Sequence, residues 1–323
     1  MSNFNIGQLK GFVIFTLVII GLIVLPLLMG PYQTTLLTLM LIYALLAMSV
    51  DILAGYAGRT PLCHGAIFGT ATYAMMYYVS TLEGGVLTGV FFALIIALIV
   101  TFIFAILAVR TSGVYFLLLT LALGMIIWGV CQRWTSVTGG ENGIRGNIRP
   151  DWFLDPFHFY YLCLVVVGLS SWILWRFVQS PFGLTLKGIR ESESRMRSLG
   201  YNTTLHLILA FLVSGFMAGM AGILYALFNS FVSPSSVALT QSVKGLLMAI
   251  IGGVGTLFGG FVGAALMLIL ENVISSFTER WSMVLGLIFI LTMVFAPEGI
   301  LGKVLQMRRW KPKNKAESPI SMK

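Results

Sequence analysis

Four ionisable residues lie in otherwise apolar stretches of this sequence: Asp51, His64, Lys244 and Glu271. Ionisable groups at membrane depth are costly, and they usually line a polar route or relay protons. Lys244 is the most isolated, so it either lines such a route or extends its flexible side chain to the outer membrane surface. Asp51 and His64 are expected to flank a cytoplasmic opening, where they could simply be hydrated.

The sequence shows no pattern typical of an enzyme that makes or breaks covalent bonds. It lacks a P-loop, a GxSxG or HExxH motif and a paired-carboxylate arrangement, so we predict no catalytic residue and no ATP hydrolysis by this chain. The three cysteines, Cys63, Cys131 and Cys163, lie in or near apolar runs without metal-ligand spacing. We therefore expect small buried side chains rather than a disulfide or a metal site.

The most conspicuous polar stretch between apolar runs is residues 180–202, here called the charged segment. We expect it to form one helix from about residue 181 to 200. Ser180-Pro181 can start a helix, and Gly200 can stop one in the left-handed conformation.

Two features of the charged segment bear on a partner. Glu191 and Glu193 precede Arg195 and Arg197 at the i,i+4 spacing that favours ion pairs. These pairs could merely satisfy one another on a solvated face. An apolar stripe along the same helix would instead suit the docking of a soluble protein. The stripe comprises Leu186, Ile189, Met196 and Leu199.

Glycine recurs at short intervals in two apolar segments, residues 211–222 and residues 252–263. GxxxG-like spacing lets helix backbones touch, so tight packing is one interpretation. The other is a substrate path in which glycine-interrupted helices expose bare backbone to a cavity. Gly55–Gly58 shares its GxxG spacing with Gly252–Gly255, which hints at an internal repeat.

The elements that position these residues follow from composition. Of 323 residues, 58% are hydrophobic and 10% charged, whereas a soluble protein carries about a quarter charged. No run alternates as a membrane barrel would, so we predict an all-α polytopic membrane protein with about 8–10 transmembrane helices and one or two possible re-entrant or broken segments. The apolar runs fall at residues 11–29, 35–53, 64–80, 86–109, 114–131, 157–177, 205–228, 241–254, 257–274 and 281–296.

The distribution of basic residues predicts the orientation. The net charge is +9, and Lys and Arg gather on the cytoplasmic side of membrane proteins. If the N-terminus is inside and all the runs cross, fifteen of the 20 Lys and Arg residues fall inside. We therefore expect a multi-pass protein of the cell membrane (plasma or inner), with both termini cytoplasmic, and no binding of nucleic acid.

Four stretches of the sequence carry a family resemblance. They are Gly55-Tyr-Ala-Gly58 continuing to Leu62-Cys-His64-Gly-Ala-Ile-Phe68-Gly; Gly113-Val-Tyr-Phe116 with Thr120-Leu121; Thr138-Gly-Gly140-Glu-Asn142-Gly143; and the charged segment running through Tyr225, Ser233-Pro234 and Gly252-Gly253-Val-Gly255-Thr256-Leu257. With these stretches, about residues 40–300 resemble the permease subunits of ABC importers for branched-chain amino acids. That family also includes urea and short-chain amide permeases.

The resemblance implies a transport subunit powered by ATP hydrolysis in other chains. Its partners would be two ABC ATPase subunits that bind ATP and Mg, a second homologous permease subunit and an extracytoplasmic substrate-binding protein. The chain itself would hold no cofactor. Residues 1–302 would form the transmembrane permease domain, with a cytoplasmic coupling helix at about residues 181–200, and residues 303–323 would form a basic cytoplasmic tail.

The resemblance also implies roles for residues of this sequence. The coupling contacts to the ATPase would come from Arg190, Glu191, Glu193, Arg195 and Gly200. The candidate translocation path comprises Gly55, Gly58, His64, Lys244, Gly252, Gly253 and Gly255. The candidate contact for the binding protein, or gate, comprises Gly139, Gly140 and Asn142.

The sequence departs from the family pattern at four positions. Arg59, Pro61 and Cys63 replace a usual Gln, Ser and Gly, and Lys244 stands where Glu is frequent. The substrate is therefore either a branched-chain amino acid or similar small polar solute, or else urea or a short-chain amide. A different class, an ion-coupled secondary transporter with Asp51, His64 or Glu271 as proton relay, is the other hypothesis.

Overall fold

The computed structural model describes residues 21–278 and the single positions 280, 283, 284, 286, 287, 290 and 299. Most of the runs 11–29 and 281–296, and the whole tail 303–323, therefore lie outside the described residues. The described part is almost entirely helical, which confirms the predicted all-α class. Its longer helices are α2 (Pro31–Asp51), α4 (Val86–Ala108), α5 (Gly113–Arg133), α7 (Pro156–Gln179), α10 (Thr203–Asn229) and α12 (Gly259–Phe277).

Shorter elements connect these helices. The α-helices among them are α3 (His64–Met76), α6 (Thr135–Thr138), α8 (Pro181–Glu191), α9 (Glu193–Ser198) and α11 (Leu239–Gly252). The π-helical and 3-10 turns are η1 (Ile52–Tyr56), η2 (Tyr77–Thr81), η3 (Gly140–Asn142), η4 (Asp151–Phe153) and η5 (Pro234–Ser236). Two short strands, β1 (Ile144–Arg145) and β2 (Phe231–Val232), pair antiparallel, with Ile144 opposite Val232.

Seven helices in the described part of the chain are long and apolar enough to cross a membrane. Together they establish a multi-pass membrane protein. They are Pro31–Tyr56, Val86–Ala108, Gly113–Arg133, Pro156–Gln179, Thr203–Asn229, Pro234–Gly252 and Gly259–Phe277.

Two of the expected crossings are broken. Helix α3 begins only after an irregular lead-in, residues 57–63, and its first residue, His64, contacts Ser214 near the middle of α10. Helix α11 has 14 residues, about 21 Å of helix, against a hydrocarbon thickness of about 30 Å. The two broken segments meet where Ser242 of α11 accepts a hydrogen bond from the backbone N–H of Gly65 at 2.9 Å.

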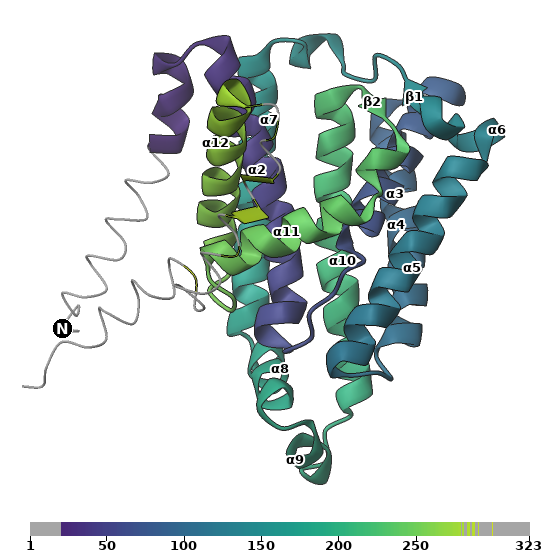
Figure 1. Ribbon diagram of the computed structural model, residues 1–323, viewed down its shortest axis with the longest axis vertical. Helices are drawn as coiled ribbons and strands as arrows, with labels where there is room; N and C mark the ends of the chain where they lie inside the picture. Colours follow the sequence, from purple (N-terminus) through teal and green to yellow (C-terminus); the bar gives the residue numbers. More distant parts are fainter. Residues whose placement is uncertain are drawn as a thin grey trace, which may run out of the picture.

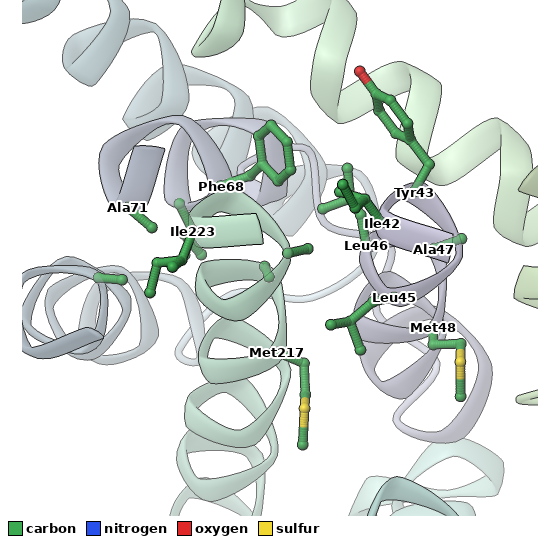
Figure 2. Packing of buried hydrophobic residues seen from close by; sticks show 14 of the residues in the cluster. Ile42, Tyr43, Leu45, Leu46, Ala47, Met48, Phe68, Ala71, Met217 and Ile223 are labelled. Carbon is green, nitrogen blue, oxygen red and sulfur yellow. The ribbon is translucent and has the colours of Figure 1, made fainter. Parts of the chain in front are cut away.

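Helices α2, α3 and α10 supply the largest shares of the hydrophobic core, part of which is drawn in Figure 2. Figure 2 shows Ile42 and Leu46 of α2 facing Phe68 of α3, with Ile223 of α10 beside it. The glycines of α10 turn towards α4 and α3: an added Cβ on Gly219 would lie 3.0 Å from Ala97, and on Gly222 it would meet the Phe68 carbonyl. Tight helix packing therefore explains the glycines of residues 211–222.

The molecule has two distinct ends (Figure 1). Helices α8 and α9 lie at one end, below the last turns of α2 and α7, whereas β1, β2 and α6 lie at the other. Two helices thus replace the single helix expected for the charged segment. The break is at Ser192, whose backbone is extended (φ −160°, ψ 99°) and whose hydroxyl caps α9 by accepting from the backbone N–H of Arg195.

Candidate functional site

Helix α8 is attached to the transmembrane body by its apolar face. Leu186 and Ile189 are 0% and 4% exposed, so they pack within this chain and are not part of a docking stripe, contrary to the expectation from the sequence. Met196 of α9 is also packed against the core. Leu199, with 67% of its surface exposed, is the one member of the expected stripe that remains exposed among the described residues.

The polar face of α8 makes a hydrogen bond to η1, which ends the span that begins with α2. The Arg190 guanidinium donates a hydrogen bond to the backbone carbonyl of Gly55 in η1. Gly58 lies directly under the same side chain: it has φ +69°, and an added Cβ would lie 2.7 Å from the Arg190 Cγ. The arginine thus contacts the backbone on both sides of residues 56 and 57.

A second contact is made by Arg59, which is 7% exposed. Its Nη2 lies 2.8 Å from Oε2 of Glu193, and its Nη1 donates to the carbonyls of Val109, at 2.9 Å, and Thr111. Arg59 therefore joins α9, the α4–α5 connection and the lead-in to α3. This role was missed from the sequence, although the replacement of a usual Gln by Arg at this position was a signal.

Glu193 is the centre of a small network at the start of α9. Besides Arg59, it accepts from Arg197 at 2.6 Å and from the Thr203 hydroxyl at 3.2 Å. The predicted i,i+4 pair of Glu193 and Arg197 is confirmed. The pair expected between Glu191 and Arg195 is not formed in the described structure, because the break at Ser192 puts these residues on different helices.

Asp51 joins the two GxxG segments. One carboxylate oxygen accepts from the backbone N–H of Gly255 at 2.6 Å and the other from that of Leu257 at 3.0 Å. Asp51 is 2% exposed, so the simpler of the interpretations left open by the sequence, a hydrated group at an opening, does not hold. Gly55 lies against Gly255, and an added Cβ on Gly55 would meet the Gly255 backbone.

A pocket of about 300 Å³ opens between α8 and these two glycine segments. The pocket brings together Arg190 and Glu191 of the expected coupling group. It also includes Gly55 and Gly255 of the expected path. Lys187 sits over the Tyr56 ring at 5.4 Å from its centroid, at the edge of the same space. The pocket is lined by Gly55, Tyr56, Lys187, Arg190, Glu191 and Gly255.

Two other path residues lie elsewhere. His64 is fully buried, with Nε2 2.6 Å from the Ser214 hydroxyl, which donates to the Ser49 carbonyl at 2.5 Å. Of the interpretations left open for His64, simple hydration is therefore excluded. Gly252 packs against α12, because an added Cβ would meet the Gly259 carbonyl. Gly252 therefore has a packing role, because it allows α11 and α12 to approach closely.

Lys244 of α11 is paired with Glu271 of α12, with Nζ 2.5 Å from Oε2. The ammonium also lies 4.8 Å from the centroid of the Tyr43 ring. The side chain is therefore engaged between helices instead of extending to the membrane surface. Both residues stood out in the sequence as charges within apolar runs, but nothing in their spacing indicated that they are partners.

The loop expected to contact a binding protein lies at the end opposite the charged segment (Figure 1). Gly139 and Gly140 both have positive φ, and Asn142 is exposed. The strand pairing of β1 with β2 ties this loop to the chain just before α11. Arg149, to which no site role was assigned from the sequence, donates to the Phe228 carbonyl at 2.5 Å at the same end.

Among the described residues, no group of three or more His, Cys, Asp or Glu side chains is arranged to hold a metal ion. The polar groups at the charged end instead hold backbone segments: Arg190 holds residue 55, Arg59 holds residues 109 and 111, and Asp51 holds residues 255 and 257. These contacts link the charged segment and the end of α2 to the connections between other transmembrane helices.

Comparison with known proteins gives the family. Residues 32–293 match the family described as "Branched-chain amino acid transport system / permease component". The chain belongs to this permease family. The permease is 28% identical over 293 residues to the high-affinity branched-chain amino acid transport system permease protein LivM of Salmonella typhimurium, covering 82% of this chain and 68% of LivM.

Two further relatives of the permease are more distant. It is 24% identical over 284 residues to LivH, a high-affinity branched-chain amino acid transport system permease protein of Salmonella typhimurium, covering 81% of this chain and 91% of LivH. It is 25% identical over 213 residues to LsrC, the autoinducer 2 import system permease protein of Klebsiella pneumoniae, covering 60% of each chain. No solved structure matches the permease.

Proposed function

We propose that this chain is the membrane-spanning subunit of an ATP-driven importer for branched-chain amino acids or similar small polar solutes. Two ABC ATPase subunits, which bind ATP and Mg, would act on the charged segment. A second, homologous permease would complete the path, and an extracytoplasmic binding protein would deliver the solute. The relatives LivM and LivH, both named as branched-chain amino acid permeases, support this substrate class.

The main support for the proposal is that the charged segment contacts residues 55–59 at two points. Arg190 holds the Gly55 carbonyl, and Glu193 holds the Arg59 guanidinium. The remaining surface of α8 and α9 is exposed and charged, with Arg195 and Glu191 among its exposed residues. Such a surface suits a soluble partner whose movement is to be passed into the membrane.

A movement of α8 and α9 would be transmitted to the transmembrane helices through two sets of contacts. Through Arg59 it acts on residues 57–63, the irregular lead-in to α3. Through Gly55 and Asp51 it acts on the connection between α11 and α12, because the Asp51 carboxylate holds the backbone of Gly255 and Leu257. Both routes end at the broken helices α3 and α11, so ATP-driven movement alternates the access of the path between these helices.

The proposed orientation puts α8 and α9 in the cytoplasm. The described basic residues at this end outnumber those at the β1–β2 end, as expected from the positive-inside rule. The loop of residues 132–155, at the β1–β2 end, is then extracytoplasmic and is positioned for a binding protein or gate. Its pairing with β2 gives a contact there a direct mechanical connection to α11.

Reconstitution tests the proposal. The tagged full-length chain is purified with the subunits that accompany it, the subunits are identified by mass spectrometry, and the complex is placed in liposomes. We expect uptake of labelled leucine only with the ATPase subunits, internal ATP and the binding protein. Uptake by the chain alone, driven by an ion gradient and indifferent to ATP, would establish a secondary transporter instead. Labelled urea and acetamide in the same assay test the alternative substrates.

A further inference from the structure

The ion pair of Lys244 and Glu271 joins α11 to α12 of the permease. Both helices are long and apolar enough to span a membrane when α11 is taken with η5. The side chains are 19% and 24% exposed, so the pair is neither sealed in the core nor fully solvated. Glu271 adjoins Asn272, which accepts from the hydroxyl of Tyr32, close to the beginning of α2.

Partly exposed charges on membrane-spanning helices do not have lipid as their neighbour, because charged groups in such helices face a water-filled cavity or another protein. Helix α11 crosses the molecule between α12 and α10 (Figure 1). The face that carries the pair therefore borders the path or the second permease subunit. On the path side, the two charges would meet a solute that moves along α11.

The surroundings of the pair are aromatic. The Tyr43 ring lies beneath the ammonium, with its hydroxyl 3.2 Å from the Gln241 amide oxygen. The Tyr225 ring is edge-on to Tyr43, with a centroid distance of 6.1 Å. Aromatic faces next to a cation stabilise it and also provide apolar surface for a hydrocarbon group.

Charge balance decides which solute can enter between the two residues. Removing one member of a largely buried ion pair leaves the other charge without a partner, which is unfavourable. A neutral amide brings no charge to replace either partner, and a simple anion or cation replaces only one. An α-amino acid zwitterion brings both, so it can separate the pair and leave neither charge without a partner.

We propose that Lys244 and Glu271 form a recognition site for zwitterionic α-amino acids in the translocation path. The substrate carboxylate binds the Lys244 ammonium, the substrate ammonium binds the Glu271 carboxylate, and an apolar side chain lies against Tyr43 and Tyr225. This inference rests on the proposed transport function and selects amino acids over urea and amides as the substrate class.

A binding experiment on the assembled complex tests the site without the binding protein. Thermal unfolding is followed with leucine, with 4-methylpentanoate, which lacks the ammonium, with 3-methylbutylamine, which lacks the carboxylate, and with acetamide. Because a ligand of the native state raises its unfolding temperature, leucine alone should do so. We expect an apparent Kd for leucine at least about tenfold lower than for the other three, a tenfold step being about 1.4 kcal/mol.

The Lys244→Met/Glu271→Leu double variant separates recognition from a structural role. Replacing both members of an ion pair by apolar side chains of similar size generally preserves folding. We expect this variant to fold but to lose leucine binding by at least about tenfold. The matched control, Tyr32→Phe/Asn272→Leu, removes a hydrogen bond between the neighbouring helices α2 and α12 without removing a charge, and it should bind leucine as the wild type does.

Three results would overturn the site: wild type that leucine does not stabilise, wild type that the singly charged analogues stabilise equally, or a double variant that binds leucine normally. If the double variant does not fold, the charge exchange Lys244→Glu/Glu271→Lys replaces it, and loss of the preference for zwitterions in that variant counts against the site. A complex that shows no ATP-dependent uptake of any solute overturns the proposed function instead.

Discussion

The carboxylate of Asp51 accepts a hydrogen bond from the backbone N–H of Gly255, 204 residues further along the chain, at 2.6 Å. This contact fixes the end of α2 to the connection between α11 and α12. It also explains why an ionisable group is kept in an otherwise apolar helix: two backbone donors that would otherwise be buried without partners are satisfied by one side chain.

Substituting Asp51 by Asn should destabilise the protein. Asparagine offers one acceptor oxygen where aspartate offers two, so either the N–H of Gly255 or that of Leu257 loses its partner. A buried unsatisfied donor costs about 1–3 kcal/mol, and the thermal unfolding midpoint in lipid nanodiscs should fall accordingly. Asp155→Asn is the control, since Asp155 caps α7 at an exposed position where Asn serves equally well. Equal midpoints for the two variants would contradict the role of Asp51.

The pair of Arg59 and Glu193 predicts a charge-reversal result. Arg59→Glu and Glu193→Arg should each reduce binding-protein-stimulated ATP hydrolysis, by about tenfold if about 1.4 kcal/mol of coupling is lost. The double reversal should recover part of the loss, because the partners again attract each other. The measurement is the stimulated ATPase rate of the reconstituted complex, together with leucine uptake.

Arg197 supplies the control for this cycle. It pairs with the same Glu193 at 2.6 Å, but 63% of its side chain is exposed, and its other hydrogen bond in the described structure is to Thr203 and not to residues 57–63. Exposed pairs contribute little, so Arg197→Glu should change the rate much less than Arg59→Glu. A double reversal no more active than either single reversal would show that the Arg59–Glu193 contact does not transmit the movement.

Local patterns in the sequence predicted local structure well. Pro181 begins α8 and Gly200, with φ +88°, follows the end of α9, both as expected. The break at Ser192 was missed because the glutamate–arginine spacing favours one helix, whereas the Ser192 hydroxyl offers a competing cap that starts a second.

The contacts of the candidate site could not be derived in the same way. Arg59 and Glu193 are 134 residues apart, and Lys244 and Glu271 come from different helices, so neither pair follows from periodicity. The burial of His64 depends on α3 starting in the interior beside Ser214, which only the packing of α3 on α10 determines. The sequence identified which residues were unusual, and the fold determined their partners.

The contact between α11 and α12 predicts a large effect of one methyl group. An added Cβ on Gly263 would meet the Met248 carbonyl and lie 3.0 Å from the Gly252 nitrogen, so Gly263→Ala must push the helices apart, at a cost of about 1–3 kcal/mol. Gly129→Ala, in α5, meets nothing within 4 Å and should be stabilising by up to about 1 kcal/mol, since alanine favours helix over glycine. Thermal unfolding of both variants measures the difference, and a neutral Gly263→Ala would contradict the close approach.

The two exposed leucines of the charged segment test whether α9 or α8 forms the docking face for the ATPase. Leu199 and Leu184 are 67% and 64% exposed, but Leu199 follows α9, at the extreme end of the molecule, whereas Leu184 lies on α8, nearer the membrane body (Figure 1). In the proposed assembly the soluble ATPase meets α9 before α8, so Leu199→Asp should weaken its association with the permease by about tenfold or more, as expected for an apolar contact of about 1.5–3 kcal/mol. Leu184→Asp should leave association nearly unchanged.

Association is measured by co-purification and by titration of the ATPase onto the permease in nanodiscs. Both variants keep the buried Leu186 and Ile189 intact, so folding should be preserved. The reverse ranking would place the ATPase contact on α8, and two unaffected variants would exclude both leucines from the docking face.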